Sequence, residues 1–141
     1  MVDWEERLSG AGCRVTQLRR AVARVLLAAS AGLSPREILV RGRQLHCRLD
    51  LVTVYRTLAL LQELHLVRRI HRHDGCRGYV AASPGYRHAL ICQNCGQAEE
   101  FLGCGVLADL IQRVEAASGY RVDDHLLQLF GTCSDCLRQG A

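Results

Sequence analysis

The sequence contains no lysine, and all 18 of its basic side chains are arginines. It has no apolar run approaching the roughly 20 residues that a membrane-spanning helix needs. The N-terminal stretch MVDWEERLSGAG is acidic and lacks the apolar core of a secretory signal. No Ser–His–Asp pattern, phosphate-binding glycine loop or carboxylate pair stands out along the chain. We therefore expect a cytoplasmic protein that contacts no membrane and is not an enzyme.

The composition predicts a folded chain whose two halves differ in charge. With 141 residues, of which 49% are hydrophobic, the chain suffices for one compact domain or two small ones sharing a core. Residues 1–80 contain fourteen arginines and seven acidic residues, a net charge of +7, whereas residues 81–141 contain four arginines and seven acidic residues, a net charge of −3. The basic half suits a polyanion. A solvated arginine-rich surface is the alternative that charge alone leaves open.

The basic half begins with three predicted helices. Apolar residues at helical spacing predict the first over residues 16–30, with Thr16 as its N-cap. Ser34 and Glu37 form an S-x-x-E capping box with a proline at the first helical position, which predicts the start of the second. The stretch DLVTVYRTLALLQELHLV predicts the third, with Asp50 as its cap.

The third predicted helix presents a polar face that suits the major groove of DNA. Its apolar stripe consists of Leu51, Val54, Leu58 and Leu61. At about 100° per residue, Thr53, Arg56 and Glu63 point away from that stripe, and Tyr55 lies at its margin. An arginine can donate two hydrogen bonds to guanine, and a tyrosine ring or threonine methyl can contact a thymine methyl.

A basic hairpin follows the third helix. In LVRRIHRHDGCRGYV the pair Asp74–Gly75 predicts a hairpin turn, and the flanks carry Arg69, Arg72 and Arg77 as candidate phosphate contacts. Three helices and then a basic two-stranded hairpin is the order of a winged helix-turn-helix, in which the hairpin is the wing. A three-helix domain with a hairpin that binds no DNA is the alternative.

Two C-x-x-C motifs in the acidic half predict one zinc site. A C-x-x-C turn directs two sulfur atoms at one point, and two such turns complete a tetrahedral four-thiolate site for Zn²⁺. The predicted ligands are Cys92, Cys95, Cys133 and Cys136. In a reducing compartment the eight cysteines are thiols or metal ligands rather than disulfides. A thioredoxin-like redox motif is the competing interpretation, although it requires one pair at a helix N-terminus after a strand.

The 37 residues between the two motifs exceed the spacing of about 15–20 in a zinc ribbon, so they must contain structure. The stretch VLADLIQRVEAASGY predicts a helix that Gly119 ends, and HLLQLFG predicts a strand that returns the second motif to the first. The side chains expected to face inward from this helix are Val106, Leu110, Val114 and Ala117.

The motifs RVTQLRRAV, SPREI, TVYRTLALLQELHLVRRI, ALICQNCGQAEEF and GYRVDDHLLQLFGTCSDC, in this order, resemble the ferric uptake regulator family of metal-dependent repressors, most of all its zinc uptake regulators. The resemblance covers essentially the whole chain. It implies an α+β fold: a winged-helix DNA-binding domain over residues 1–81, a hinge over 82–86, and a dimerisation and zinc-binding domain with a small sheet and one long helix over 87–141. It also implies a homodimer with structural zinc that binds an AT-rich palindromic operator in double-stranded DNA.

The same resemblance assigns residues to DNA. Tyr55 and Arg56 match the base-contacting pair of the family's recognition helix, beside Thr53. Arg14 matches the basic residue that reaches the minor groove.

A second, regulatory divalent metal is expected, but several of the family's ligand positions hold other residues here. The candidate regulatory ligands are Cys76, His88, Glu100, Cys104 and His125. Cysteine and histidine ligands would favour Zn²⁺ over Fe²⁺. The alternatives are a zinc-stapled DNA-binding protein that senses iron, another metal or nothing, and, more remotely, a thiol oxidoreductase.

Overall fold

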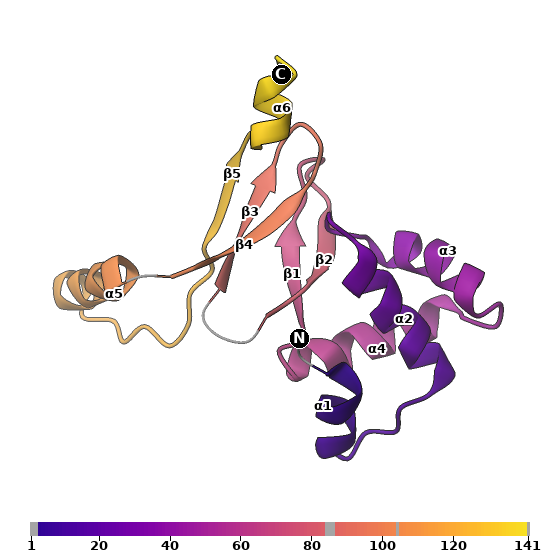
Figure 1. Ribbon diagram of the computed structural model, residues 1–141. Coiled ribbons are helices and arrows are strands. Elements are labelled where there is room, and N and C mark those ends of the chain that lie inside the picture. The colour runs from indigo at the N-terminus through magenta and orange to yellow at the C-terminus, as the bar shows by residue number, and fades with distance from the viewer. Residues whose placement is uncertain (1–2, 84–86, 104, 141) are drawn as a thin grey trace.

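The computed structural model describes residues 3–83, 87–103 and 105–140. Its N-terminal half is a group of four helices on one side of the molecule (Figure 1). These are α1 (Trp4–Gly10), α2 (Gln17–Ala28), α3 (Pro35–Leu45) and α4 (Leu51–Glu63). The last three are the predicted helices, and α1 precedes them.

Side-chain caps begin the predicted helices where the sequence indicated. The Thr16 hydroxyl accepts a hydrogen bond from the Arg19 N–H at 3.2 Å, and the Asp50 carboxylate accepts one from the Thr53 N–H at 2.7 Å. At α3 both halves of the capping box form, since Ser34 and Glu37 each accept from the other's N–H. These bonds satisfy backbone donors that the first turn leaves free, so each cap fixes its helix start.

The helices pack around one apolar cluster, whose most deeply buried members are Val22, Leu26, Ile38, Leu49, Val54, Leu58 and Leu61. On α4 the predicted stripe is confirmed at Val54, Leu58 and Leu61, while Leu51 is half-buried at the first turn. Burial of this stripe sets the rotation of α4 and leaves Tyr55 and Arg56 exposed. The core thus determines which side of the helix is available to a partner.

The predicted hairpin consists of β1 (Val67–His71) and β2 (Arg77–Ala81), paired antiparallel with His71 opposite Arg77. Its turn contains Gly75 at φ +81°, a left-handed conformation that glycine adopts without a steric cost. Leu33, between α2 and α3, exchanges two backbone hydrogen bonds with Tyr79 of β2. The hairpin is therefore tied to the helices as the wing of a winged helix-turn-helix.

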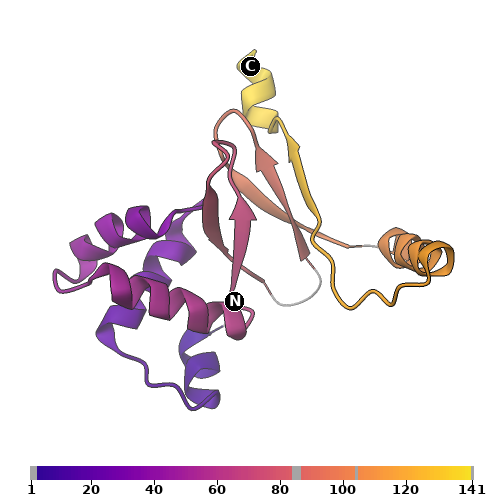
Figure 2. The same cartoon turned by 180° about the vertical axis from the view of Figure 1, so that it is seen from behind.

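The C-terminal half contains a second sheet of β3 (Arg87–Cys92), β4 (Ala98–Leu102) and β5 (Gln128–Gly131), in the order β4–β3–β5. Helix α5 (Gly105–Ser118) extends away from the sheet, and the short α6 (Ser134–Arg138) lies beyond its end, as Figure 1 and Figure 2 show. Strands β3 and β4 are antiparallel, whereas β3 and β5 are parallel. The predicted α+β class is confirmed, and none of the described helices is long and apolar enough to span a membrane.

The wing packs against both halves. Val67 of β1 belongs to the helical core, whereas Ile70 of the same strand is buried against Ala89 and Ile91 of β3. In both Figure 1 and Figure 2 the hairpin lies between the helices and the second sheet. The predicted hinge falls partly outside the described residues, at 84–86.

The prediction that α5 buries its apolar side within the chain is wrong. None of its side chains is buried: Val106 is 72% exposed, Leu110 is 54% exposed and Ala117 is also exposed. Val114 is 46% exposed. The helix forms as helical periodicity predicts and ends before Gly119, but the described part of the chain does not bury its apolar side.

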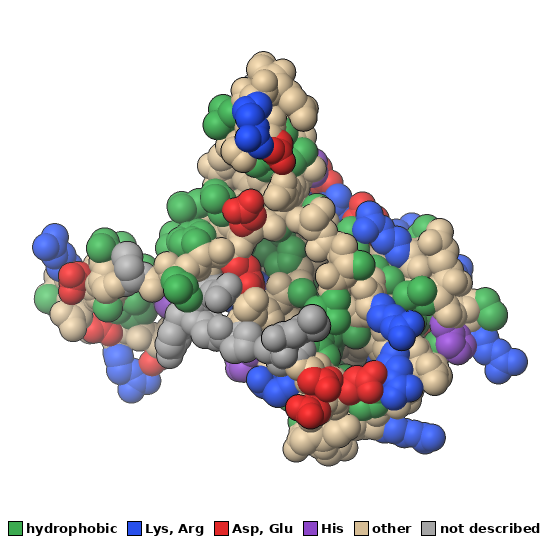
Figure 3. Space-filling model, viewed as in Figure 1, with side chains coloured by type: hydrophobic (Ala, Val, Ile, Leu, Met, Phe, Trp, Pro, Cys, Tyr) green, Lys and Arg blue, Asp and Glu red, His purple; other side chains and the backbone are tan. Residues whose placement is uncertain are grey.

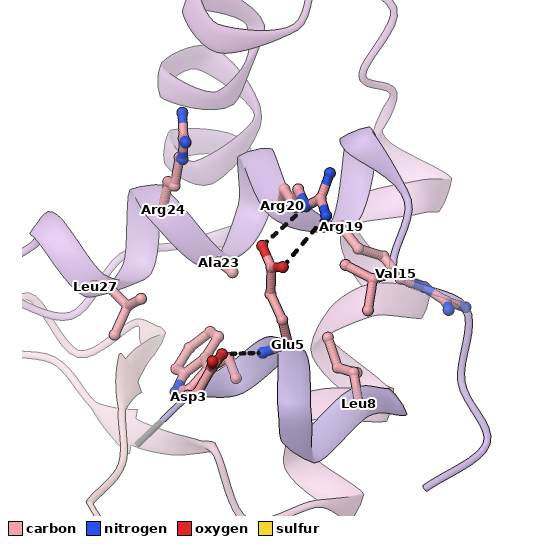
Figure 4. Close-up of a pocket in the computed structure, with 10 residues that line it drawn as sticks. Asp3, Glu5, Leu8, Val15, Arg19, Arg20, Ala23, Arg24 and Leu27 are labelled. Atoms are coloured by element: carbon pink, nitrogen blue, oxygen red, sulfur yellow. Dashed lines mark hydrogen bonds and ion pairs between the residues drawn. The ribbon is translucent and has the colours of Figure 1, made fainter. Parts of the chain in front are cut away.

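A groove of about 500 Å³ separates α1 from α2 (Figure 4). Trp4 and Leu8 of α1 are buried at its base, and Glu5 binds Arg20 of α2 through two hydrogen bonds of 2.9 and 3.2 Å. These contacts hold α1 against the helical core. They also fix both ends of the loop between α1 and α2, which carries the exposed Arg14.

We expect Ser34→Ala to lower the free energy of unfolding of the zinc-loaded protein by about 1 kcal/mol, because the Glu37 N–H loses its acceptor. Urea denaturation followed by circular dichroism measures the change. Ser9→Ala on the exposed side of α1 is the matched control, with an expected change below about 0.5 kcal/mol. Equal changes in the two variants would contradict a stabilising role of the capping box.

Candidate metal centre and DNA-binding surface

Four cysteine sulfur atoms meet at the end of the second sheet. The Sγ atoms of Cys92, Cys95, Cys133 and Cys136 all lie within 4.8 Å of one another. Cys92 and Cys136 are 3.9 Å apart, and Cys95 and Cys133 are 3.8 Å apart. Both distances far exceed the roughly 2.05 Å of a disulfide bond. The two C-x-x-C motifs therefore form one cluster of thiols, as the sequence predicted.

The sulfur geometry fits a tetrahedral Zn²⁺ ion. Four thiolates at about 2.3 Å from a central ion lie about 3.8 Å from one another, close to the separations of the two pairs. Thiolate sulfur is also the donor that structural zinc sites use most. Among the residues that the structure describes, this is the only group of three or more metal-binding side chains whose ligand atoms converge.

The pairing of β3 with β5 builds the cluster. Cys92 is the last residue of β3 and lies in parallel register with Gly131, the last residue of β5. The chain then turns so that Cys133 caps α6 and Cys136 lies within it. On the other side, Gly96 at φ +79° closes the turn that holds Cys95. Two strand ends from distant parts of the sequence thus place the four sulfur atoms.

Hydrogen bonds and mutual repulsion give the thiols different acidities. The Cys133 N–H donates to Cys92 Sγ at 3.3 Å and lowers the pKa of the Cys92 thiol to about 6. The Asn94 amide donates to Cys136 Sγ at 3.1 Å, but the neighbouring sulfur atoms and burial outweigh it and raise the pKa of Cys136 to about 12. The pKa of Cys95 is raised as well. A divalent cation offsets this repulsion and allows all four sulfurs to ionise.

Asn94 is a member of this site that sequence reasoning missed. It lies between the cysteines of the first motif, and its bond to Cys136 joins the first motif to the second. Only its position inside C-x-x-C was a signal, and asparagine is common in turns for other reasons.

The candidate regulatory ligands that the structure describes do not converge on one point. His88 and His125 are neighbours, with ring centroids 5.3 Å apart. Cys76 lies exposed in the turn of the wing, where its N–H donates to Asp74. Cys104 lies outside the described residues. The complete ligand set therefore stays a prediction.

His88 has the properties of a free ligand. It is only 6% exposed, and its Nε2 atom has no hydrogen-bond partner among the described residues. Burial, and then the charges of His125 and Arg68, lower the pKa of His88, so its imidazole is neutral near pH 7. Gly103 leaves room for the ring, since a Cβ atom at that position would lie 2.5 Å from Nε2. Cys104 is the next residue in the sequence.

Glu100 is engaged by other groups of the chain. The Ser83 N–H lies 3.1 and 3.3 Å from its two carboxylate oxygens, and Arg68 Nη1 lies 3.8 Å from one of them. Ala89, opposite Glu100 in the β3–β4 ladder, is buried against the wing. Side chains paired across a ladder share a face and neighbours along a strand alternate, so Glu100 faces the wing and His88 faces away from it.

The DNA-facing candidates are exposed as the rotation of α4 requires. Tyr55 is 52% exposed, Arg56 is exposed, and Thr53 is half-buried at the first turn. Arg69 and Arg77 of the wing are also exposed. On the face that Figure 3 shows, arginine side chains gather over the helical half, and hydrophobic side chains lie around α5 and β5.

Arg72 differs from the other wing arginines. Its side chain is 15% exposed, and its guanidinium binds Glu37 of α3 at 2.6 and 3.2 Å and Asp74 at 3.3 Å. Gly78 makes space for it, because a Cβ atom there would lie 2.7 Å from Arg72 Cδ. Arg72 therefore joins the wing to α3. Because its guanidinium is already bound by Glu37 and Asp74, we no longer expect it to contact phosphate.

Comparisons with known proteins agree over most of the chain. Residues 10–130 match the profile of the ferric uptake regulator family. The chain is 32% identical over 129 residues to the zinc uptake regulation protein of Mycobacterium tuberculosis, covering 92% of this chain and 98% of the relative. It is 30% identical over 136 residues to the ferric uptake regulation protein of Campylobacter jejuni, covering 92% and 83%. A zinc uptake regulator solved with zinc and DNA shares the fold at a TM-score of 0.80 and 21% identity, covering 96% of this chain and 91% of that chain.

We expect Cys136→Ala to lose the metal of the four-cysteine cluster, whereas Cys47→Ala, at an exposed cysteine outside it, keeps about one zinc ion per chain at that cluster. Metal analysis after removal of weakly bound ions measures the content. Because metal binding contributes to folding, the free energy of unfolding should fall by several kcal/mol in Cys136→Ala only. Full zinc content in Cys136→Ala would contradict the assignment.

Proposed function

The chain belongs to the ferric uptake regulator family, and from that premise we propose that it is a zinc-responsive transcriptional repressor. It acts in the cytoplasm and binds an AT-rich palindromic operator in double-stranded DNA as a homodimer. The observation that carries this proposal is the combination, in one chain, of a winged helix with an exposed arginine–tyrosine face and a converging four-cysteine cluster. The first supplies DNA binding, and the second holds together the half of the chain that pairs with a second copy.

Helix α4 is the recognition helix in this proposal. Its buried stripe directs Tyr55 and Arg56 outward, where the guanidinium can donate to guanine and the ring can contact a thymine methyl. Thr53 lies at the end of the helix that would enter the groove. Arg14, in the loop anchored by α1, reaches the minor groove, and Arg69 and Arg77 of the wing neutralise phosphates.

The C-terminal half supplies the dimer. The apolar residues of α5 are exposed in the single chain, and so are Leu129 and Phe130 of β5. Exposed apolar residues gathered on one half of a chain are typical of an interface. Pairing two copies buries them and presents two α4 helices to successive half-sites, so a palindromic operator matches the symmetry of the dimer.

Cys92, Cys95, Cys133 and Cys136 hold the structural zinc in this proposal. The ion joins the end of β3 to α6. Because α6 has only five residues, it needs such a link to stay in place. When bound, zinc supplies four bonds and the charge that keeps the thiolates ionised. Its contribution is to stability rather than to sensing.

His88 and His125 are the core of the regulatory site in this proposal, with Cys104 as a third ligand. A neutral buried imidazole without a hydrogen-bond partner is suited to a divalent metal, and histidine with cysteine favours zinc. The metal regulates by population shift, since it stabilises the DNA-binding arrangement only if it binds that arrangement more tightly.

A second candidate function is a zinc-stapled DNA-binding protein without a sensor. The observation in its favour is Glu100, whose carboxylate is bound by the Ser83 N–H and lies beside Arg68. The Arg68 guanidinium beside Glu100 repels a metal cation. The ion pair between Arg68 of the wing and Glu100 of the sheet then joins the two without a metal. The dependence of operator binding on free zinc separates the two candidates.

We expect Arg56→Ala to weaken operator binding by about 1–3 kcal/mol and to relax base preference at the contacted position, because the arginine reads a base edge. Fluorescence anisotropy with operator variants at constant salt measures both effects. Arg121→Ala, at an 86% exposed side chain in the C-terminal half, is the matched control. If Arg56→Ala bound as tightly as the control, α4 would not be the reading element.

We expect His88→Ala to keep the structural zinc but to lose the response of operator binding to added zinc. An operator titration at buffered free Zn²⁺, with metal analysis alongside, measures both. His46→Ala, at the C-cap of α3, is the control and should respond as the wild type does. An unchanged response in His88→Ala places the sensor elsewhere, and a wild type that ignores zinc supports the second candidate function.

A further inference from the structure

One side chain of the C-terminal half binds the main chain of the wing. The His71 N–H donates to Gln128 Oε1 at 3.0 Å, and Gln128 Nε2 donates to the His71 carbonyl at 2.5 Å. The N–H and C=O of one residue in a strand point to the same side, so this pair lies on the edge of β1 that does not face β2. Gln128 thus completes the free edge of the wing strand as a neighbouring strand would.

Gln128 is held firmly where it makes this contact. It is the first residue of β5 and lies in parallel register with Ala89, whose side chain is buried against the wing. In-register residues of paired strands share a face, so Gln128 also faces the wing. The half-buried Gln128 amide joins β5 directly to β1 through these two hydrogen bonds.

The contact acts at the turn end of the wing, where the next residue, Arg72, also binds Glu37 of α3. His71 is the last residue of β1 and pairs with Arg77, the first residue of β2 and an exposed arginine. The start of β1 is already fixed, because Val67 lies in the helical core. Since Gln128 holds main-chain atoms, it fixes the position of the strand itself, and with it the direction in which Arg77 points.

We propose that Gln128 is a positioning residue for DNA binding: its amide fixes the tip of the wing so that Arg77 meets a phosphate. This inference rests on the proposed DNA-binding function. It adds that the C-terminal half helps to set the orientation of the wing, through two hydrogen bonds to the main chain of His71.

The test uses Gln128→Met in the full-length, zinc-loaded protein. Methionine is similar in length but makes neither hydrogen bond, and Gln139→Met at an exposed position is the matched control. We expect operator affinity to fall by about tenfold in Gln128→Met, as for loss of two hydrogen bonds from the bound arrangement, and to stay unchanged in Gln139→Met. The wild-type zinc content and dimer should be retained by both variants.

A double-mutant cycle with Arg77→Ala distinguishes positioning from general stability. If Gln128 acts through Arg77, the double variant binds DNA about as weakly as Arg77→Ala alone, because a misplaced arginine and an absent one are equivalent. Additive losses, or no loss in Gln128→Met, overturn the inference. If Gln128→Met does not fold, Gln128→Glu keeps the acceptor for the His71 N–H and removes the donor, so it should bind more weakly than the wild type. Full wild-type affinity in Gln128→Glu overturns the inference as well.

Hydrogen exchange at the His71 amide provides a direct measurement. The amide should exchange faster in Gln128→Met than in the wild type, while the buried amide of Ile91 stays protected in both. Equal exchange at His71 in the two proteins overturns the contact. Arg56→Ala in the same binding assay separates the two proposals: if it weakens binding and Gln128→Met does not, only the positioning role fails, and if no variant and no operator shows binding, the proposed function fails.

Discussion

The parallel pairing of β3 with β5 is the constraint on which the C-terminal half depends. It places the ends of β3 and β5 at the same edge of one sheet. The two cysteine motifs at these ends are separated by 37 residues in the sequence. Four thiols within 4.8 Å repel one another when they ionise, which is why the pKa of Cys136 rises to about 12 while the N–H of Cys133 lowers that of Cys92 to about 6. The cluster and the sheet therefore support each other, since a cation stabilises the thiolates only after the strands have brought them together.

The wing connects this arrangement to the helical half of the chain. It is a small hairpin, but β1 contributes Val67 to the helical core and Ile70 to the core of the second sheet. Polar contacts accompany the apolar ones: Arg72 binds Glu37 of α3 on one side, while Glu100 and Gln128 engage the wing from the other. A domain boundary placed between the wing and the second sheet, as the sequence favoured, separates side chains that pack together, since Ile70 of the wing is buried against Ala89 and Ile91. The orientation of the DNA-binding half is thus set by contacts that both halves share.

Helix α5 shows where sequence reasoning succeeds and where it stops. Its length and its end at Gly119 follow from helical periodicity and from a glycine that adopts φ +75°. Periodicity identifies an apolar side, but not what covers it. None of the residues that the structure describes buries the side chains of α5, and the exposed residues of α5 and β5 point to a second copy. Arg72 is the opposite case, a residue expected to be free that has a partner within the chain. The sequence predicts that this wing arginine contacts phosphate, but Glu37 binds it.

The sequence by itself determined the helix starts at Thr16, Ser34 and Asp50, the turn at Gly75, and the residues of the four-cysteine cluster. These features depend on residues close together in the chain, or on motifs whose chemistry allows few arrangements. Only the tertiary structure decided that Asn94 joins the two cysteine motifs, that Glu100 is taken by Ser83 and Arg68, and that Gln128 holds the wing. Each of these contacts joins residues that are distant in the sequence, and hydrogen bonds of this kind leave no periodic pattern, because they depend on how strands and helices come to lie side by side.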